Sequence, residues 1–247
     1  MGTAFRTAIV TGGSRGIGAA AVSLLARNGW RVAVGCYQRL ERANALCASL
    51  AAEGCQVFPF QGDVASAAEM EALVQAVLER WGQLDLFVNN AGIAQQKLFT
   101  DLTEEDWDRM FAVNARSLFT CCRAAVPHMV RRHTGNIINI SSIWGQVGAS
   151  CEVHYSAAKA AVIGFTKALA KELGPSGIRV NCVAPGVIAT EMNDALDPET
   201  LAALREETPL GSIGTPEDVA RTILWLAEEG SAFITGQVIG VNGGFVI

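Results

Sequence analysis

Short apolar runs rich in β-branched residues alternate along this chain with longer stretches of helical periodicity. Such alternation is typical of repeated strand–helix units, which build one parallel sheet with helices on both faces. The expected strands lie near residues 7–10, 31–34, 56–60, 84–89, 136–141, 179–183 and 237–241. The expected helices lie near residues 16–28, 40–53, 66–81, 103–131, 153–173 and 216–228. The pattern therefore predicts an α/β fold with a doubly wound, seven-stranded parallel sheet.

The length of 247 residues suits one large α/β domain, and no linker, repeat or low-complexity tract divides it. We therefore expect a single domain over residues 1–247. The interval 186–214 breaks the alternation, because its roughly thirty residues exceed a plain strand–helix connection. Long excursions at the carboxyl ends of strands often cover a site. One or two short mobile helices over the substrate are expected there.

The composition excludes several classes of protein. Half of the residues are hydrophobic and 17% are charged, as in soluble globular proteins. No apolar run reaches the roughly 18 residues of a membrane span, and the first strand-like run, "TAIV", follows no signal-peptide pattern. We therefore expect a cytoplasmic protein without a membrane partner. The net charge of -5 argues against nucleic-acid binding, which requires a basic surface.

The seven cysteines are scattered and contain no C-x-x-C pair, so free thiols in a reducing compartment are expected. The chain has only three histidines, at positions 128, 133 and 154, and they form no closely spaced set with the cysteines. A metal site is therefore not expected.

A glycine-rich stretch, "TGGSRGIG", follows the first expected strand directly and leads into a helix. Glycine permits a tight turn and lets a phosphate approach main-chain N–H groups, while the helix N-terminus adds partial positive charge. The position within the first strand–helix–strand unit favours a nucleotide site. The candidate cofactor-binding residues in this stretch are Gly12, Ser14, Arg15, Gly16, Ile17 and Gly18.

The end of the second strand bears on the choice of nicotinamide cofactor. An NAD site usually has an acidic residue there, which binds the ribose 2′-hydroxyl and repels a 2′-phosphate. Here Gly35 and Cys36 end the strand, Arg39 follows, and Arg15 lies in the glycine loop. Two cations and no carboxylate favour NADP(H). The alternative is that Arg39 and Arg42 simply form a solvated helix face.

Tyr155 and Lys159 are separated by four positions in an expected helix, so their side chains share one face. Such a pair arises often by chance. Its context gives it weight, because the strand "NIINISS" ends at Ser142, at the same edge of the sheet as the expected nucleotide site.

Together these features resemble the short-chain dehydrogenase/reductase family, which has a single Rossmann-like domain, over essentially the whole chain. The matching motifs are "TGGSRGIG" (11–18), "GDV" (62–64), "NNAG" (89–92), "VN" (113–114), "INISS" (138–142), "YSAAK" (155–159), "RVN" (179–181), "PG" (185–186) and "ITGQ" with "VNGG" (234–244). By this resemblance Asn114, Ser142, Tyr155 and Lys159 form a catalytic tetrad. The resemblance also implies cofactor contacts from Asp63 and Val64 at the adenine, Asn90, Ala91 and Gly92 at the ribose, Pro185, Gly186, Ile188 and Thr190 toward the nicotinamide, and Tyr155 and Lys159.

The tetrad would reduce a ketone with hydride from the nicotinamide. Hydride transfer leaves negative charge on the ketone oxygen, so the site needs a proton donor and an electrostatic cradle. Tyr155 is the expected donor, with its pKa lowered from about 10 by Lys159 and the oxidised nicotinamide. Lys159 would also hold the ribose, Ser142 would bind the carbonyl oxygen, and Asn114 would hold a water. The alternative for Asn114 is a packing role within its helix.

Within the family the sequence looks closest to β-ketoacyl-acyl-carrier-protein reductases, which use NADPH on a 3-oxoacyl thioester in fatty acid biosynthesis. The stretch "VRRH" at 130–133 either docks the acyl carrier protein or is a solvated helix end. One departure concerns Glu152, which stands where those reductases commonly have glutamine. A carboxylate at the substrate mouth would repel an anionic carrier arm and attract an amine. The other interpretation is that Glu152 faces solvent or caps the helix N-terminus.

The string "SSIWG...GASCEVHY" is also similar to reductases that act on a 5-aminopentanone group on elongation factor P. That protein is therefore the alternative partner, with Glu152 and Trp144 as candidate substrate residues. A non-catalytic NADP-binding scaffold is a further alternative, disfavoured because all four tetrad residues are present. Family resemblance implies a homotetramer with twofold axes. The small residues of the helix at 153–173 suit such a contact, or simply tight packing on the sheet.

Overall fold

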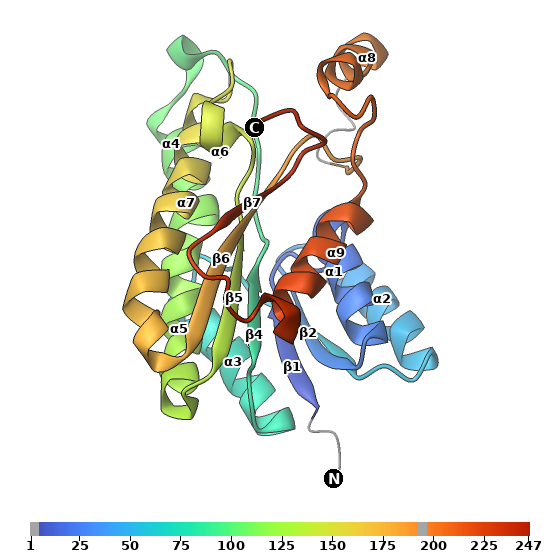
Figure 1. The fold of residues 1–247 in the computed structure, drawn as a ribbon, viewed down its shortest axis with the longest axis vertical. Helices are drawn as coiled ribbons and strands as arrows, with labels where there is room; N and C mark the ends of the chain where they lie inside the picture. Colours follow the sequence, from blue (N-terminus) through green and yellow to red (C-terminus); the bar gives the residue numbers. More distant parts are fainter. Residues whose placement is uncertain (1–4, 192–196) are drawn as a thin grey trace.

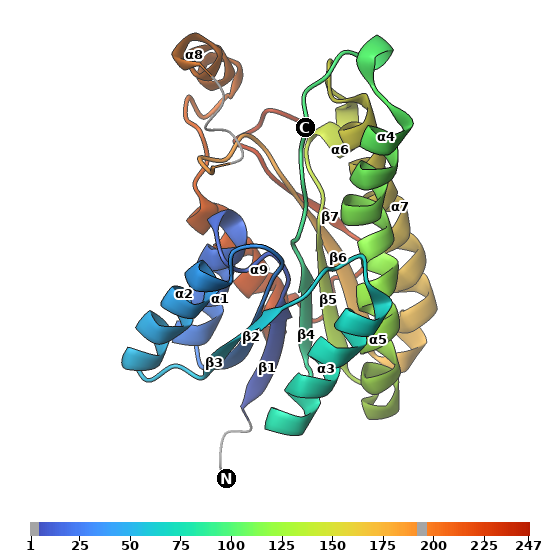
Figure 2. The same ribbon diagram turned by 180° about the vertical axis from the view of Figure 1, so that it is seen from behind.

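The structure is a computed structural model that describes residues 5–191 and 197–247. Its strands form one parallel sheet of seven strands in the order β3-β2-β1-β4-β5-β6-β7. The strands are β1 (Arg6–Val10), β2 (Trp30–Cys36), β3 (Val57–Gln61), β4 (Leu86–Asn89), β5 (Gly135–Ile140), β6 (Ile178–Pro185) and β7 (Val238–Val241). The predicted α/β architecture is confirmed, since helices cover both faces of the sheet (Figures 1 and 2).

The helices lie in two layers. The α-helices are α1 (Gly16–Arg27), α2 (Leu40–Ala52), α3 (Ala67–Trp81), α4 (Glu104–Phe111), α5 (Ser117–Arg132), α6 (Trp144–Val147), α7 (Val153–Leu173), α8 (Pro198–Glu207) and α9 (Pro216–Ala227). Helices α1, α2 and α9 cover one face of the sheet, and α3, α5 and α7 cover the other (Figures 1 and 2). Helices α4, α6 and α8 rise at the upper end in Figure 1, where the strands have their carboxyl ends.

Each face of the sheet has its own apolar core. In β1, Ala8 and Val10 pack toward α1, α2 and α9, whereas Ile9 between them packs toward α3 and α5. All three are fully buried. A strand covered on both faces must be apolar at successive positions, which explains why the strands read as continuous hydrophobic runs.

The strand order reverses at β1. This strand pairs with β2 on one side and with β4 on the other. The chain first builds outward to β3 and then returns across β1 to build β4–β7. At such a reversal the connections leave the two central strands in opposite directions, and a crevice opens at their carboxyl ends. The fold therefore places a binding crevice above β1 and β4.

The single helix predicted over 103–131 is wrong. It divides into α4, a π-helical turn at Ala112–Arg116, and α5. Asn114 lies in that turn, and its side-chain Nδ2 donates to the Met110 main-chain oxygen at 3.1 Å. That oxygen, four residues earlier, is the one that the Asn114 main-chain N–H would use in a regular α-helix. The side chain therefore competes with the helical ladder, and the backbone widens locally.

The interval 186–214 contains the short helix α8 among its described residues, and its role in covering a substrate stays a prediction. The start of this interval is hydrogen-bonded to its end, just before α9. The Ala189 N–H donates to the Gly214 oxygen at 2.9 Å, and the Gly214 N–H donates to the Val187 oxygen at 3.0 Å. Residues 192–196 of the predicted covering segment lie outside the described residues. Helix α8 stands over the carboxyl ends of the strands (Figure 1).

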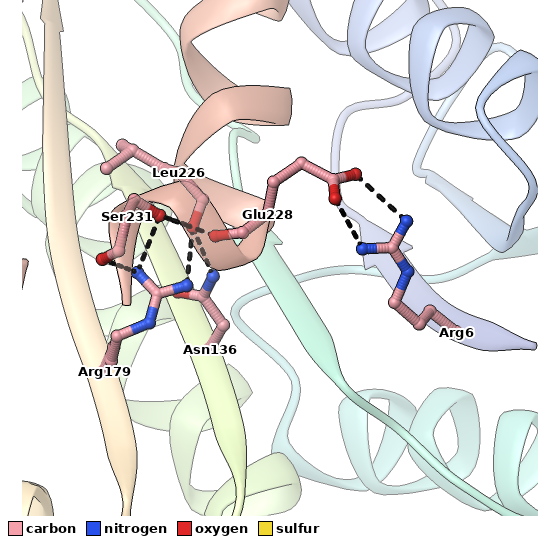
Figure 3. Close-up of polar contacts among 6 residues, drawn as sticks. All are labelled: Arg6, Asn136, Arg179, Leu226, Glu228 and Ser231. Carbon is pink, nitrogen blue, oxygen red and sulfur yellow. Dashed lines mark hydrogen bonds and ion pairs between the residues drawn. The ribbon is translucent and has the colours of Figure 1, made fainter. Parts of the chain in front are cut away.

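The opposite end of the sheet is held by a network of polar contacts at the end of α9 (Figure 3). The Arg179 guanidinium donates to the Leu226 main-chain oxygen at 2.7 Å and to the Ser231 oxygen and hydroxyl at 3.2 Å each. Arg6, at the start of β1, forms a bidentate ion pair with Glu228 at 2.7 and 3.0 Å. These contacts provide hydrogen-bond donors for carbonyls at the end of α9 and attach this helix to β1 and β6.

We expect Arg179→Ala to lower the free energy of unfolding by about 2 kcal/mol, because acceptor groups on the buried residues Leu226 and Ser231 lose a charged donor. Arg27→Ala is the control, since Arg27 makes an exposed bidentate pair with Glu53 and its loss is expected to be smaller. Urea denaturation followed by tryptophan fluorescence measures both. Equal losses for the two variants would contradict a structural role for the Arg179 network.

Candidate active site

A cavity of about 1220 Å³ lies at the carboxyl ends of the strands. Residues that directly follow five strands line it: Thr11 after β1, Tyr37 after β2, Asn90 after β4, Ser141 after β5 and Gly186 after β6. This is the crevice that the reversal of strand order creates. Three-dimensional structure therefore brings segments from the whole length of the chain to one site.

Every candidate site residue taken from the sequence lines this cavity. The first group forms what we call the glycine-loop end: Gly12, Ser14, Arg15, Gly16, Ile17, Gly18, Arg39, Asp63, Val64, Asn90, Ala91 and Gly92. The second group forms the tyrosine end: Asn114, Ser142, Trp144, Glu152, Tyr155, Lys159, Pro185, Gly186, Ile188 and Thr190. The two groups face one continuous space, as a nucleotide and a second ligand beside it would require.

Close packing explains why the glycine loop needs glycine. Gly12 has a φ of 63°, and a Cβ there would meet the Ala91 Cα at 2.9 Å. A Cβ on Gly18 would lie only 2.1 Å from the Gly12 oxygen. The loop is tied to the end of β4, because Asn90 Nδ2 donates to the Thr11 oxygen at 2.9 Å. The N-terminus of α1 is thereby held at the cavity, and no acidic side chain stands in its first turn.

The arginines near the end of β2 do have an acidic partner, contrary to the reading from sequence. Glu191 forms ion pairs with Arg39 at 2.8 Å, with Arg15 at 3.6 Å and with Arg42. These guanidinium groups hold the pKa of the Glu191 carboxyl below its usual range, Arg42 most strongly. No local sequence pattern indicates this contact, because Arg39 and Glu191 are 152 positions apart. Arg39 and Arg42 are therefore ion-paired side chains as well as part of a helix surface.

At the tyrosine end, Tyr155 and Lys159 lie on α7 against the end of β5. The Lys159 Nζ donates to the Ile140 oxygen at 3.0 Å and lies 5.7 Å from the centre of the Tyr155 ring. The Ser141 hydroxyl donates to the Lys159 main-chain oxygen at 2.7 Å. Tyr155 and Ser142 are each 7% exposed, and the Ser142 hydroxyl accepts from the Trp144 N–H at 3.2 Å. Strand and helix are thus locked together where the three functional groups meet.

Burial dominates the protonation of this pair. It raises the pKa of Tyr155 to about 12; the Ser142 hydrogen bond lowers that pKa, while the negative charge of Glu152 raises it. Burial also lowers the pKa of Lys159 to about 8. In the protein alone the net shift of the Tyr155 pKa is therefore upward, opposite to the lowered pKa expected from Lys159 and the oxidised nicotinamide together. The free-energy cost of removing the phenolate from water exceeds the stabilisation that neighbouring groups give it.

Asn114 is 1% exposed, and its carboxamide is fully engaged. Its Oδ1 accepts from the Ile93 N–H at 3.2 Å, and its Nδ2 donates to the Ile93 oxygen at 2.9 Å and to the Met110 oxygen. The side chain therefore has the packing role that sequence left open as an alternative. Any water bound by Asn114 must use its main-chain carbonyl instead of the carboxamide.

Glu152 is a buried carboxylate on the cavity wall, only 9% exposed. It occupies the N-cap position of α7 but accepts no capping hydrogen bond, and its partner is Gln96 Nε2 at 3.2 Å. Burial raises its pKa. The preceding residue, Cys151, has a φ of 62°, which is a left-handed conformation uncommon for a non-glycine residue. The interpretation that Glu152 faces solvent or caps the helix is therefore wrong.

Sequence reasoning missed Gln96 and His154. The His154 ring is fully buried, and its Nε2 lies 3.0 Å from Gln95 Oε1. Gln95 and Gln96 belong to an irregular segment after β4, so no periodic pattern pointed to them. Trp144 lines the cavity at the start of α6 and packs edge-to-face with Phe245, with ring centres 5.7 Å apart.

The stretch "VRRH" is at the other end of the molecule, where α5 ends before β5 begins. Arg132 forms an ion pair with Asp85 at 2.8 Å and donates to the Leu84 oxygen at 3.2 Å. This arginine therefore has a structural role in the chain itself. All seven cysteines are free thiols. Within residues 5–191 and 197–247, no three His, Cys, Asp or Glu side chains gather as a metal site, and no helix has the length and apolarity to cross a membrane.

A doubly wound sheet with a glycine loop at its crevice and a buried tyrosine–lysine pair beside it defines a class of nucleotide-dependent oxidoreductases. Comparison with known proteins agrees. A family profile described as "Enoyl-(Acyl carrier protein) reductase" matches residues 12–246. The chain belongs to the short-chain dehydrogenase/reductase family, as an oxidoreductase that acts on a CH–OH or C=O group.

Individual relatives match almost end to end. The chain is 42% identical to a 3-oxoacyl-[acyl-carrier-protein] reductase FabG of Staphylococcus aureus, with 97% of each chain covered. It is also 42% identical to a 3-oxoacyl-[acyl-carrier-protein] reductase of Synechocystis, over 98% of this chain and 97% of that one. The crystal structure of a dehydrogenase/reductase from Sinorhizobium meliloti 1021 superposes with a TM-score of 0.93 at 38% identity, covering 99% of this chain and 96% of that one.

We expect Gly18→Ala to reduce nicotinamide nucleotide affinity at least about tenfold, because a Cβ there collides with the Gly12 oxygen and displaces the loop. Gly164→Ala on α7 is the matched control, since a Cβ at Gly164 meets nothing within 4 Å. Fluorescence titration with reduced nucleotide measures both. Unchanged affinity in Gly18→Ala would mean that the loop does not hold the nucleotide.

Proposed function

We propose that this protein is an NADPH-dependent carbonyl reductase that converts a ketone to a secondary alcohol. The observation that carries the proposal is the convergence of Tyr155, Lys159 and Ser142 on the cavity that also contains the glycine loop. Catalysis of hydride transfer to a carbonyl requires a proton donor and a nucleotide within one space. This cavity offers both.

The residues at the glycine-loop end fit NADP(H). Gly12 and Gly18 leave space that side chains would fill, so a diphosphate can approach the main chain and the N-terminus of α1. Arg15 and Arg39 line the cavity beyond the end of β2, where the adenosine ribose of a dinucleotide lies in this fold. Two guanidinium groups there suit a 2′-phosphate. When bound, the reduced nicotinamide supplies the hydride and leaves a positively charged ring.

The other cofactor contacts follow family resemblance and the lining of the cavity. Asp63 and Val64 would lie beside the adenine, and Asn90, Ala91 and Gly92 beside the ribose. Ser14, Gly16 and Ile17 would complete the phosphate loop. Pro185, Gly186, Ile188 and Thr190 would lie toward the nicotinamide. All of these residues line the same cavity.

In the proposed mechanism the Ser142 hydroxyl and the Tyr155 hydroxyl both donate to the ketone oxygen. As negative charge grows on that oxygen, Tyr155 transfers its proton to it. A pKa of about 12 keeps the phenol protonated at neutral pH, which suits a donor. The Lys159 ammonium stabilises the phenolate left behind and holds the ribose. The main-chain carbonyl of Asn114 would hold the water that returns the proton.

Removing the phenol hydroxyl tests the proton donor. We expect Tyr155→Phe to lower kcat for ketone reduction by at least about 100-fold, because the forming alkoxide loses its proton source. NADPH affinity should change little, since the ring and its packing remain. Retained turnover with unchanged binding would reject Tyr155 as donor. Absence of turnover by the wild type on any ketone, with NADPH still bound, would instead support the scaffold alternative.

The lowered pKa of Lys159 predicts a pH dependence. Its ammonium is present below pH 8 and is lost as pH rises through about 8. We therefore expect kcat/KM for NADPH, which reports the cofactor-free protein, to fall above about pH 8. Initial rates in constant-ionic-strength buffers from pH 6 to about 10 give the profile. A flat profile to the upper end would contradict the assigned role of the Lys159 charge.

We propose a 3-oxoacyl-[acyl-carrier-protein] as the substrate and fatty acid biosynthesis as its setting. Support comes from relatives of that name that match nearly the whole chain at 42% identity. The carrier-bound ketone would enter the tyrosine end, beside Trp144. We further propose a cytoplasmic homotetramer, in line with family resemblance and with the small residues along α7.

The alternative substrate is the 5-aminopentanone group on elongation factor P. The observation that favours it is the buried Glu152 carboxylate on the cavity wall at the tyrosine end. Such a carboxylate suits a substrate ammonium and opposes an anionic carrier arm. Comparing NADPH oxidation with an acetoacetyl carrier thioester and with aminopentanone-modified elongation factor P decides between the two. Turnover of one substrate alone selects it.

The Glu152→Gln variant isolates the charge, because glutamine keeps the shape and can still pair with Gln96. If Glu152 pairs with an ammonium, we expect KM for the amino ketone to rise about tenfold, while a neutral ketone of the same length keeps its KM. The ratio of the two kcat/KM values is the readout. An unchanged ratio would remove Glu152 as a determinant of substrate charge.

A further inference from the structure

Three guanidinium groups from two parts of the chain meet on one carboxylate at the glycine-loop end. Glu191 Oε2 lies 2.8 Å from Arg39 Nη1 and 3.6 Å from Arg15 Nη1, while Oε1 pairs with Arg42. Arg15 belongs to the glycine loop, Arg39 and Arg42 to the start of α2, and Glu191 to the segment after β6. The cluster retains an excess of positive charge, because one carboxylate balances only one of three cations.

The cluster is also divided by its exposure to the cavity. Arg15, Arg39 and Glu191 line the cavity, whereas Arg42 is not among its lining residues. The Glu191 carboxylate therefore lies on the two arginines that a 2′-phosphate would need, and Arg42 holds it from outside the cavity. A carboxylate and a phosphate make the same kind of paired contact with guanidinium groups.

We propose that Glu191 is an internal substitute for the 2′-phosphate and so a specificity-determining residue for the cofactor. The inference rests on the proposed use of NADPH. When a 2′-phosphorylated nucleotide binds, its phosphate takes Arg15 and Arg39, and Glu191 keeps only Arg42. A nucleotide with a free 2′-hydroxyl offers the arginines no replacement anion, and Glu191 stays where it is.

The exchange needs little rearrangement of the backbone. Ala189 and Val187 are hydrogen-bonded to Gly214 on either side of Ile188, so the chain is anchored two residues before Glu191. Turning the Glu191 side chain toward Arg42 is therefore enough. The Glu191 side chain is 37% exposed, so water and salt screen its ion pairs. The competition it exerts is accordingly modest and depends on ionic strength.

Binding of nucleotide fragments in the absence of ketone tests the proposal directly. We expect Glu191→Gln to tighten the binding of adenosine 2′,5′-bisphosphate and of NADPH by roughly 3- to 20-fold at low salt, and less at high salt. The binding of 5′-AMP and NADH should change less than about twofold. Isothermal titration calorimetry gives the affinities without reference to turnover.

Two further variants make the test specific. Glu41→Gln removes a negative charge from α2 between Arg39 and Arg42, and Glu41 has no ion pair in the part of the chain that the structure describes. It should leave the preference for the 2′-phosphate unchanged. In an Arg39→Gln background, the effect of Glu191→Gln should shrink, because the shared arginine is gone. An equal effect in Glu41→Gln would assign the change to net charge and overturn the proposal.

Other outcomes also decide the matter. Unchanged or weaker binding of 2′-phosphorylated ligands to Glu191→Gln overturns the competition, while the NADPH proposal stands if the wild type prefers NADPH. Selective loss of NADH binding would mean that Glu191 accepts the ribose hydroxyl, and it also overturns the proposal. A wild type that binds NADH as tightly as NADPH would overturn the proposed cofactor and this inference together.

Discussion

The reversal of strand order at β1 is the constraint on which the site depends. Because β1 pairs with β2 and β4, the loops after β1 and β4 diverge and leave a crevice between them. The crevice stays narrow at its base, where Gly12 approaches Ala91 and Asn90 bonds the main chain of Thr11. The glycines are thus needed first for packing, and the same packing points the N-terminus of α1 at the cavity.

Burial of ionisable groups governs the chemistry at the other end of the cavity. Tyr155, Lys159 and Glu152 are each less than a tenth exposed. Burial raises the pKa of Tyr155 and of Glu152 and lowers the pKa of Lys159, so that it favours the neutral form of each group. The protein thus keeps the phenol protonated and holds a lysine near its titration point. A ligand that brings charge into this space changes the balance more than it would in water, because screening there is weak. The same low screening supports the proposal that Glu152 discriminates between substrates by their charge.

Most of the fold could be predicted from the sequence, because it rests on local patterns. The helix expected over 153–173 matches α7 at both ends, and the candidate site residues all line one cavity. The failures involve contacts that no local pattern records. The π-helical turn follows from the Asn114 side chain taking a main-chain acceptor, and Glu191 reaches Arg39 from 152 positions away. The direction of the Tyr155 pKa shift depends on burial, which only packing reveals.

The central claim is that hydride passes from a nicotinamide at the glycine-loop end to a carbonyl carbon held at Tyr155. Reduction of an acetoacetyl thioester with NADPH deuterated at the transferred position of C4 tests it most directly, with mass spectrometry and NMR of the product. The account predicts one deuterium on the new carbinol carbon. An enoyl thioester is offered in a parallel reaction. Deuterium on a carbon of its reduced C=C bond, with no deuterium transferred to the acetoacetyl thioester, would contradict the account.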